Sequence, residues 1–203
     1  MKRHEHQNAN VYHLLIGEKK AEDVIFQTKV PNLDISVANS DLVGAEIELV
    51  DASRREFKLK DAIQAIRNKY HYILIDCPPS LGLLTVNSLS AAETFLVPLQ
   101  CEYYALEGLS ELLQTIVLVR DNLNPKLRVK GVLMTMYQLT NLCKQVVDDV
   151  RSHLGDKVFQ TIIPRNVTLS EAPSFGKPVI YYDIKCAGAQ AYLALAREII
   201  ARG

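Results

Sequence analysis

Residues 70–82 read YHYILIDCPPSLG, and this stretch decides the fold class. Four strand-forming residues, 72–75, are followed by Asp76 and then by a turn rich in proline and serine. An apolar run bounded by turn residues is typical of a buried strand in a parallel sheet. Because α/β folds keep their chemistry at the carboxyl ends of such strands, Asp76 occupies the position of a functional carboxylate.

Strand and helix patterns alternate along the rest of the chain. Strands are expected at 33–37, 94–99, 129–136, 158–163 and 178–182, and helices from the capping-box spacing Ser53 to Glu56 onward, then around 106–117, 146–154 and 189–200. Such alternation predicts right-handed crossovers and an α/β fold with a mostly parallel sheet, flanked by helices on both faces.

The composition excludes several classes of protein. The 23 basic and 23 acidic residues cancel, so no global field draws the molecule to nucleic acid or an anionic membrane. The four cysteines form no C-x-x-C pair, which argues against a zinc site or a disulfide framework. No apolar stretch reaches the roughly 18 residues of a membrane span. A cytoplasmic protein without a membrane partner is expected.

Three places could carry chemistry, and each also has a purely structural explanation. Asp76 could hold magnesium through water, or could only hydrogen-bond its turn. The irregular stretch 163–178, which contains a second capping spacing from Thr168 to Glu171, could build a site or could simply connect two elements. Lys157, Lys177 and Lys185 belong to a lysine- and arginine-enriched second half that could contact DNA phosphates, although interspersed carboxylates also suit a solvated surface.

Long strings of the sequence resemble one family. YILIDCPPSLGLLTVNSL, VPLQCEYYALEGLSELLQTI and VFQTIIPRNVTLSEAPSFGKPVIYYD are similar to the ParA/Soj partitioning ATPases, relatives of MinD in the deviant Walker group of P-loop NTPases. The resemblance runs from about residue 11 to residue 203. It implies ATP and magnesium as cofactors, dimerisation, nonspecific DNA binding on the nucleoid, and a ParB-type centromere-binding partner that stimulates ATP hydrolysis.

The resemblance also implies roles for individual residues. Asp76 corresponds to the Walker B aspartate that holds magnesium through water. The implied nucleotide-binding residues are those of the switch that senses the γ-phosphate and those of the adenine pocket: Pro78, Pro79, Ser80 and Gly82, then Pro164, Arg165 and Asn166.

Two departures from the family pattern stand out. A phosphate loop needs closely spaced glycines followed by lysine and a hydroxyl residue, yet the nearest glycines are Gly176 and Gly188. We therefore expect residues 1–10 to be disordered and 11–203 to be an incomplete ParA/MinD-type domain without the P-loop strand and the strand after it. In addition, residues 182–189 read YDIKCAGA where the family usually has YDPRSRGA, which removes arginines suited to phosphate.

Two functions remain open at this point. The chain could be the larger part of a partitioning ATPase whose phosphate loop lies on another piece, or a degenerate, non-enzymatic relative that binds a full-length ParA, a ParB or DNA. In both cases ATP hydrolysis by these residues alone is not expected, because nothing replaces the N–H cradle and lysine that stabilise phosphoryl charge.

Overall fold

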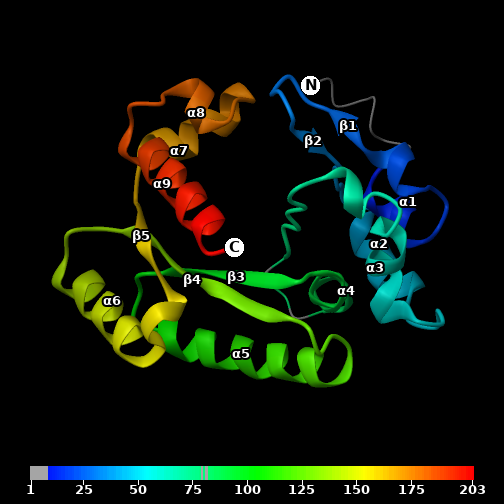
Figure 1. The fold of residues 1–203 in the computed structure, drawn as a ribbon, viewed down its shortest axis with the longest axis horizontal. Coiled ribbons are helices and arrows are strands. Elements are labelled where there is room, and N and C mark those ends of the chain that lie inside the picture. The colour runs from blue at the N-terminus through cyan, green and yellow to red at the C-terminus, as the bar shows by residue number, and fades with distance from the viewer. Residues whose placement is uncertain (1–8, 79, 81) are drawn as a thin grey trace. The chain divides into compact units, whose positions relative to one another are not determined.

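The computed structural model describes residues 9–78, 80 and 82–203, and Figure 1 follows its elements along the chain. Pro79, one of the expected switch residues, lies outside the described residues, as does most of the stretch expected to be disordered. Two compact units divide the chain: Met1–Glu93 with Thr115–Leu127, and Thr94–Gln114 with Arg128–Gly203. The expectation of one domain over 11–203 stays a prediction.

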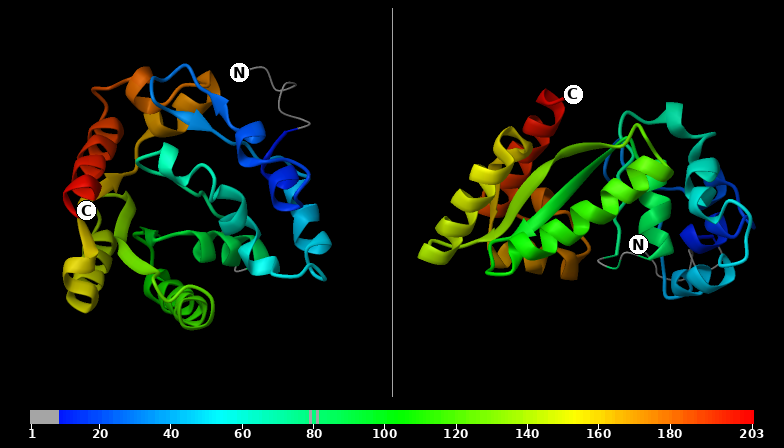
Figure 2. Two further views of the ribbon diagram at one scale, coloured as in Figure 1. Left: turned by 45° about the vertical axis from the view of Figure 1, so that its right-hand side comes forward. Right: turned by 90° about the horizontal axis from the view of Figure 1, so that it is seen from below.

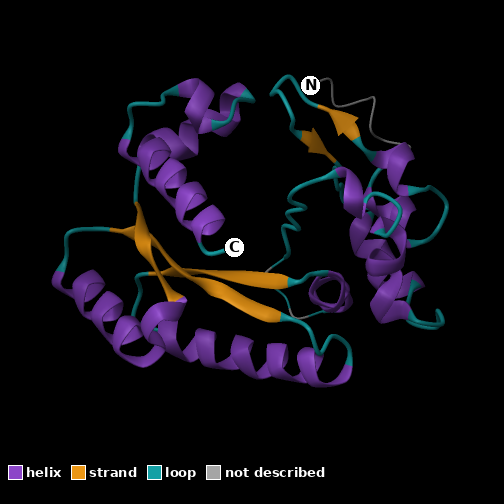
Figure 3. Cartoon of the chain, in the orientation of Figure 1, coloured by secondary structure: helices purple, strands orange, loops and turns teal. Residues whose placement is uncertain are grey.

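The second unit contains the parallel sheet, drawn in orange in Figure 3. Its strands lie side by side in the order β3 (Thr94–Gln100), β4 (Arg128–Tyr137) and β5 (Val158–Pro164), and both pairings are parallel. The crossovers are α5 (Ala105–Asn122) and α6 (Asn141–Leu154). These strands and helices confirm the alternation predicted from the sequence.

Helices cover both faces of this sheet, as the fold class predicted. Side chains that alternate along the strands separate into two clusters, because successive residues of a strand point to opposite faces. Val132 and Met134 pack with α5 and α6, whereas Leu133 and Phe159 pack with Leu195 of α9 (Ala187–Ala201). Figure 1 shows α5 and α6 on one side of the strands and α9 on the other, and Figure 2 gives two further views.

A bulge in β5 is held by α9. Val132 of β4 pairs with Val158 of β5, and Met134 pairs with Ile162, so β5 runs over residues 158–162 while β4 runs only over residues 132–134. In a regular strand consecutive N–H groups point to opposite edges, but the N–H groups of Gln160 and Thr161 both donate to the carboxylate of Glu198, at 2.8 and 2.9 Å. Partial burial opposes ionisation of Glu198, yet these bonds and Arg202 outweigh it, so the pKa of Glu198 lies below its ordinary value.

Arg202 completes this attachment of α9 to the sheet. Its guanidinium pairs with Glu198 at 2.8 Å and donates to the carbonyl oxygens of Asp156 and Val158, at 3.1 and 2.9 Å. It also lies 4.3 Å from the ring centroid of Phe159, which is fully buried. We call Glu198 and Arg202 the α9 clamp. Because Glu198 makes two hydrogen bonds to β5, and Arg202 makes one and also contacts the ring of Phe159, the clamp determines how this strand is seated.

The first unit is built mainly from short helices. They are α1 (Val11–Leu15), η1 (Ala21–Val24), α2 (Leu42–Glu48), η2 (Arg55–Phe57), α3 (Lys58–Ile63), η3 (Arg67–Lys69) and α4 (Leu83–Ala91), joined by a small antiparallel pair, β1 (Phe26–Gln27) and β2 (Asp34–Ile35). The apolar side chains of α3 pack within this unit, since Leu59 and Ile63 contact the cluster of Leu14, Val24 and Ile66.

Two expected strands are absent. Residues 72–75 form no strand, and Leu74 is 92% exposed. A strand requires a neighbour for its N–H and C=O groups, and among the described residues none pairs with this segment. Residues Val179–Tyr182 form the helix α8, because the N–H of Tyr182 and of Asp183 bond to carbonyls four residues earlier, at 3.0 and 2.8 Å. Both strand predictions were therefore wrong.

Two expected helix caps also differ. The spacing of Ser53 and Glu56 makes no capping box: Arg54 adopts a left-handed conformation with φ 54°, and η2 and α3 follow it. After β5, α7 (Val167–Glu171) is capped by Asn166, two residues before the expected Thr168. The remaining 3-10 turns are η4 (Gly155–Lys157) and η5 (Ala172–Phe175). In the part of the chain that the structure covers, no helix is long and apolar enough to cross a membrane.

Candidate functional site

Asp76 lies in an exposed segment of the first unit that has no regular secondary structure. Tyr70 begins this segment and donates its hydroxyl to Asp34 at 2.8 Å, a hydrogen bond that, with burial, raises the pKa of Tyr70. Tyr72 is 58% exposed, and Asp76, Cys77 and the following Pro78 are exposed as well. The carboxylate of Asp76 is therefore accessible to a ligand.

The turn after Asp76 leads into α4, whose first residue follows Gly82. The carbonyl of Ser80 accepts a hydrogen bond from the hydroxyl of Thr85 at 2.6 Å, which ties the turn to the first turn of the helix. Glu46 of α2 accepts from the N–H of Leu84 at 3.3 Å. A Cβ at Gly82 would lie 2.3 Å from Glu46 Oε1, so a side chain at position 82 would push the flexible end of Glu46 away from the N–H of Leu84.

A buried amide anchors α4 to the rest of the first unit. Asn87 is 1% exposed; its Oδ1 accepts from the N–H of Leu59 at 3.1 Å. Its Nδ2 donates to the carbonyls of Arg55 and Leu83, at 2.8 and 3.1 Å. At the other end of α4, Asn124 donates to the last carbonyls of the helix. The side-chain amides of Asn87 and Asn124 therefore hold α4, the helix that begins directly after Gly82 of the expected switch.

Neither Glu46 nor Asn87 was singled out from the sequence. Glu46 sits in a helix of ordinary amphipathic composition, and Asn87 lies in the segment LLTVNSLSA, where a single polar residue has many explanations. Their partners lie 38 and 28 residues away, so no local spacing marks either residue. A cavity of about 420 Å³ lies beside them, lined by Glu46, Arg55, Gly82 and Val86 among others.

The expected adenine-side residues lie in the second unit, where β5 ends. Pro164 is the last residue of β5 and pairs with Tyr137 of β4. The N–H of Arg165 donates to the carbonyl of Tyr137 at 3.0 Å, which extends the ladder by one residue. Asn166 accepts from the N–H of Leu169 at 3.3 Å and caps α7. The structure thus brings these three consecutive residues together at one strand end.

The lysines predicted to contact DNA are all exposed in the second unit. Lys157 is the last residue of η4, immediately before β5, whereas Lys177 and Lys185 follow the end of that strand, on either side of α8. The amide of Lys185 donates to Asp183 at 2.9 Å, so a carboxylate adjoins this lysine.

The residues present fit only part of a magnesium–nucleotide site. Asp76 offers one accessible carboxylate, and Mg²⁺ is often held by one or two carboxylates together with phosphates of its substrate. No group of three or more potential metal-ligating side chains occurs in the described part of the chain. A backbone cradle for phosphates does not fit the sequence, because no two of its nine glycines are close enough to form one.

Comparisons with known proteins agree with the motifs. The AAA domain family matches residues 1–129. Chromosome partitioning protein ParA of Caulobacter vibrioides is 55% identical over 199 residues, which cover 97% of this chain and 74% of that protein. The chain belongs to the ParA/Soj family of partitioning ATPases. The sporulation initiation inhibitor protein Soj of Bacillus subtilis is 53% identical over 194 residues, covering 95% of this chain and 77% of that protein.

A solved structure supports the same fold. Cobyrinic acid a,c-diamide synthase of Mycobacterium smegmatis, in its structure with bound ADP and magnesium, has a TM-score of 0.80 and 32% identity. The match covers 97% of this chain and 72% of that protein. ParA/Soj membership and the P-loop NTPase-like α/β fold predicted from the sequence are both confirmed.

Proposed function

We propose that this chain serves in chromosome or plasmid partitioning by the cycle expected for ParA/Soj proteins. That cycle consists of magnesium–ATP-dependent dimerisation, nonspecific DNA binding, and ATP hydrolysis stimulated by a ParB-type partner. The similarity to a chromosome partitioning protein over nearly the whole chain carries the proposal. Nucleoid association in the cytoplasm belongs to the same proposal.

Within that cycle, the described residues divide into three roles. Asp76 holds magnesium through water, and Ser80 and Gly82, with Pro78 and Pro79 between them and Asp76, transmit the state of the nucleotide into α4. The anchoring of α4 by Glu46 and Asn87 supports this role, because a helix held at several points moves as one body. Pro164, Arg165 and Asn166 contact the adenine.

These 203 residues alone are not expected to turn over ATP. Phosphoryl transfer is catalysed almost entirely by positioning and by stabilisation of charge on the phosphate oxygens. Asp76 supplies only a metal contact, and a glycine-rich N–H cradle must come from outside this sequence.

A titration with a fluorescent ATP analogue and magnesium tests this expectation. The 203-residue chain should show no saturable binding in the micromolar range. Micromolar binding that disappears in Asp76→Asn would contradict it and would reveal a nucleotide site built without the glycine loop. The partitioning role is tested separately by anisotropy of a labelled ParB-type protein and of a DNA duplex mixed with the chain; a chain that binds neither does not take part in partitioning.

A non-enzymatic interaction module is the second candidate. The exposed apolar side chains of residues 72–74 favour it, since such a segment tends to pair with another polypeptide. Light scattering of the chain mixed with a full-length ParA separates the two functions: a stable mixed complex without nucleotide supports the module, whereas assembly only with ATP supports the partitioning cycle.

A further inference from the structure

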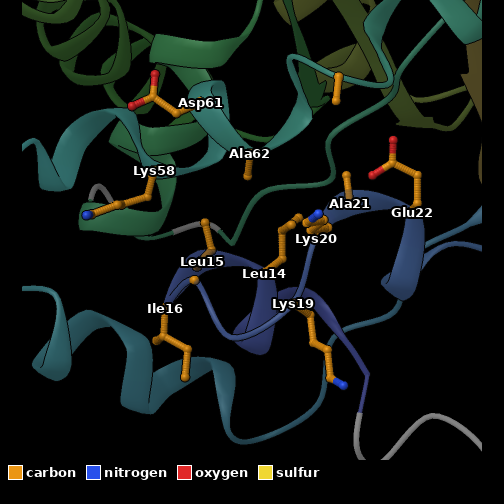
Figure 4. A pocket seen from close by; sticks show the side chains of 12 residues that line it. Leu14, Leu15, Ile16, Lys19, Lys20, Ala21, Glu22, Lys58, Asp61 and Ala62 are labelled. Carbon is orange, nitrogen blue, oxygen red and sulfur yellow. The ribbon is translucent and has the colours of Figure 1, made fainter.

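A cavity lies on the first unit, away from every residue assigned above to nucleotide or DNA. Its volume is about 360 Å³, within the size range of ligand-binding pockets. Residues 14–17 and 19–22, at the end of α1 and the start of η1, form one side, and Lys58, Asp61, Ala62 and Ala65 of the segment that includes α3 form the other. Figure 4 shows this pocket from close by.

The floor of the pocket is apolar. Leu14, Leu15 and Ala21 are 6%, 3% and 2% exposed, and Ala62 lies opposite them. Leu14 and Ala21 belong to a buried core cluster that also contains Ile66, so packing holds the floor of the pocket in place. An apolar group that enters the pocket therefore leaves water for a preformed surface.

The rim of the pocket is positive. Lys19, Lys20 and Lys58 line it, and no ion pair joins any of the three to a carboxylate within the described residues. Each of the two acidic lining residues is paired with a cation outside the pocket, although the pKa of Glu22 is lowered by the bond from Lys69 and also by the charge of Lys20 on the rim. Asp61 accepts two bonds from Arg54, each 3.1 Å, and Glu22 pairs with Lys69 at 3.0 Å.

The lysines are spread around the pocket. In Figure 4, Lys58 lies on the opposite side of Leu14 and Leu15 from Lys19. One carboxylate cannot reach both sides, but acidic residues placed before and after an apolar anchor can. We propose that this pocket binds a partner peptide in which a leucine- or phenylalanine-sized side chain is flanked on both sides by aspartate or glutamate. The site is independent of nucleotide.

Fluorescence anisotropy of the full 203-residue chain with a labelled synthetic peptide tests the site. The peptide carries a Leu-Phe pair between two Glu-Asp pairs, and matched peptides carry Ala-Ala at the centre or lysine in place of the acids. We expect saturable binding with a dissociation constant on the order of 100 µM, weakened by added salt because the flanking contacts are ionic. Neither matched peptide should bind measurably at a peptide concentration of about 100 µM.

Three variants locate the binding. Ala65→Phe, at an exposed position on the rim, should lower affinity at least about tenfold by filling the mouth, as expected for loss of a buried anchor. Lys58→Glu should lower it about fivefold, the size of roughly 1 kcal/mol of exposed charge interaction. Lys29→Glu, equally a charge reversal on the first unit but outside the pocket, should leave affinity unchanged.

Specific outcomes would overturn the proposal. The first is the absence of saturable binding up to about 1 mM peptide, roughly the weakest affinity worth calling recognition. The second is equal binding of the peptide that carries lysine in place of the acids. The third is an equal loss of peptide affinity in Lys29→Glu and Lys58→Glu. Displacement of the peptide by octanoate, or binding to anionic phosphatidylglycerol vesicles that Ala65→Phe abolishes, would assign the pocket to a fatty acid or to a membrane instead. None of these results depends on whether the chain binds ATP.

Discussion

Removing the carboxylate of the α9 clamp should destabilise the second unit. Glu198→Ala leaves the N–H groups of Gln160 and Thr161 without their acceptor and leaves Arg202 without its ion pair. A hydrogen bond to a charged group contributes about 1.5 to 3 kcal/mol. Because Gln160 is exposed, water replaces its bond, whereas half-buried Thr161 loses more. We expect a total loss of about 3 kcal/mol for alanine and about half of that for Glu198→Gln.

Urea denaturation followed by far-ultraviolet circular dichroism measures this loss. Arg197→Ala is the matched control, since Arg197 is an exposed residue of the same helix, and it should change the free energy of unfolding by less than about 0.5 kcal/mol. If Glu198→Ala and Arg197→Ala cost the same, the clamp does not hold β5 and the reasoning is refuted.

The pH dependence gives an independent check on the same carboxylate. The folded-state pKa of Glu198 is lowered from 4.5, so its stabilisation is present above that value and disappears as the pH falls through the folded-state pKa. The difference in unfolding free energy between the wild-type chain and Glu198→Gln should therefore be constant from pH 7 to about pH 5 and shrink below pH 4.5. A difference that persists unchanged in acid would mean that packing, and not charge, accounts for it.

Other positions give further outcomes. Asn87→Ala should cost about 2 to 3 kcal/mol, because buried backbone groups lose their partners, and the same urea experiment measures it. Gly82→Ala should cost about 0.5 to 1.5 kcal/mol, because the displaced Glu46 carboxylate loses its bond from the N–H of Leu84, and it should cost less when Glu46→Ala is already present; additive losses would contradict the contact. With Ellman's reagent at pH 8, exposed Cys77 should react first, whereas Cys101, whose pKa is raised to about 11 by burial and the neighbouring Cys143, should react only on unfolding.

Long, strongly patterned segments could be predicted from the sequence. β3, β4 and β5, with α5, α6 and α9, were expected close to their observed bounds, because each carries enough apolar residues to make its period clear. Residues 72–75 have the same apolar character but no strand beside them among the described residues. Composition indicates a candidate strand, and only a hydrogen-bonded neighbour makes it one.

The side chains that hold the candidate site together could not be predicted in this way. Glu46, Asn87 and Glu198 bond to backbone groups 28 to 38 residues distant, so their roles depend on how the chain returns upon itself. Asp76, in contrast, was singled out from its own segment of sequence and Asn166 from the resemblance to the family, and their roles at a nucleotide site stay predictions. For Asn166 the structure shows a helix cap, a role that local spacing had assigned to Thr168.

The α9 clamp also determines when the parallel sheet can become stable during synthesis on the ribosome. Every strand of the parallel sheet is translated before α9, and a nascent chain folds only with the segments that have already emerged. Until Glu198 and Arg202 emerge from the exit tunnel, the amides of the β5 bulge bind only water, and Phe159 lacks the cation that covers its ring. A ribosome stalled before α9 should therefore carry a protease-sensitive sheet, which becomes resistant only after residue 202 has left the exit tunnel.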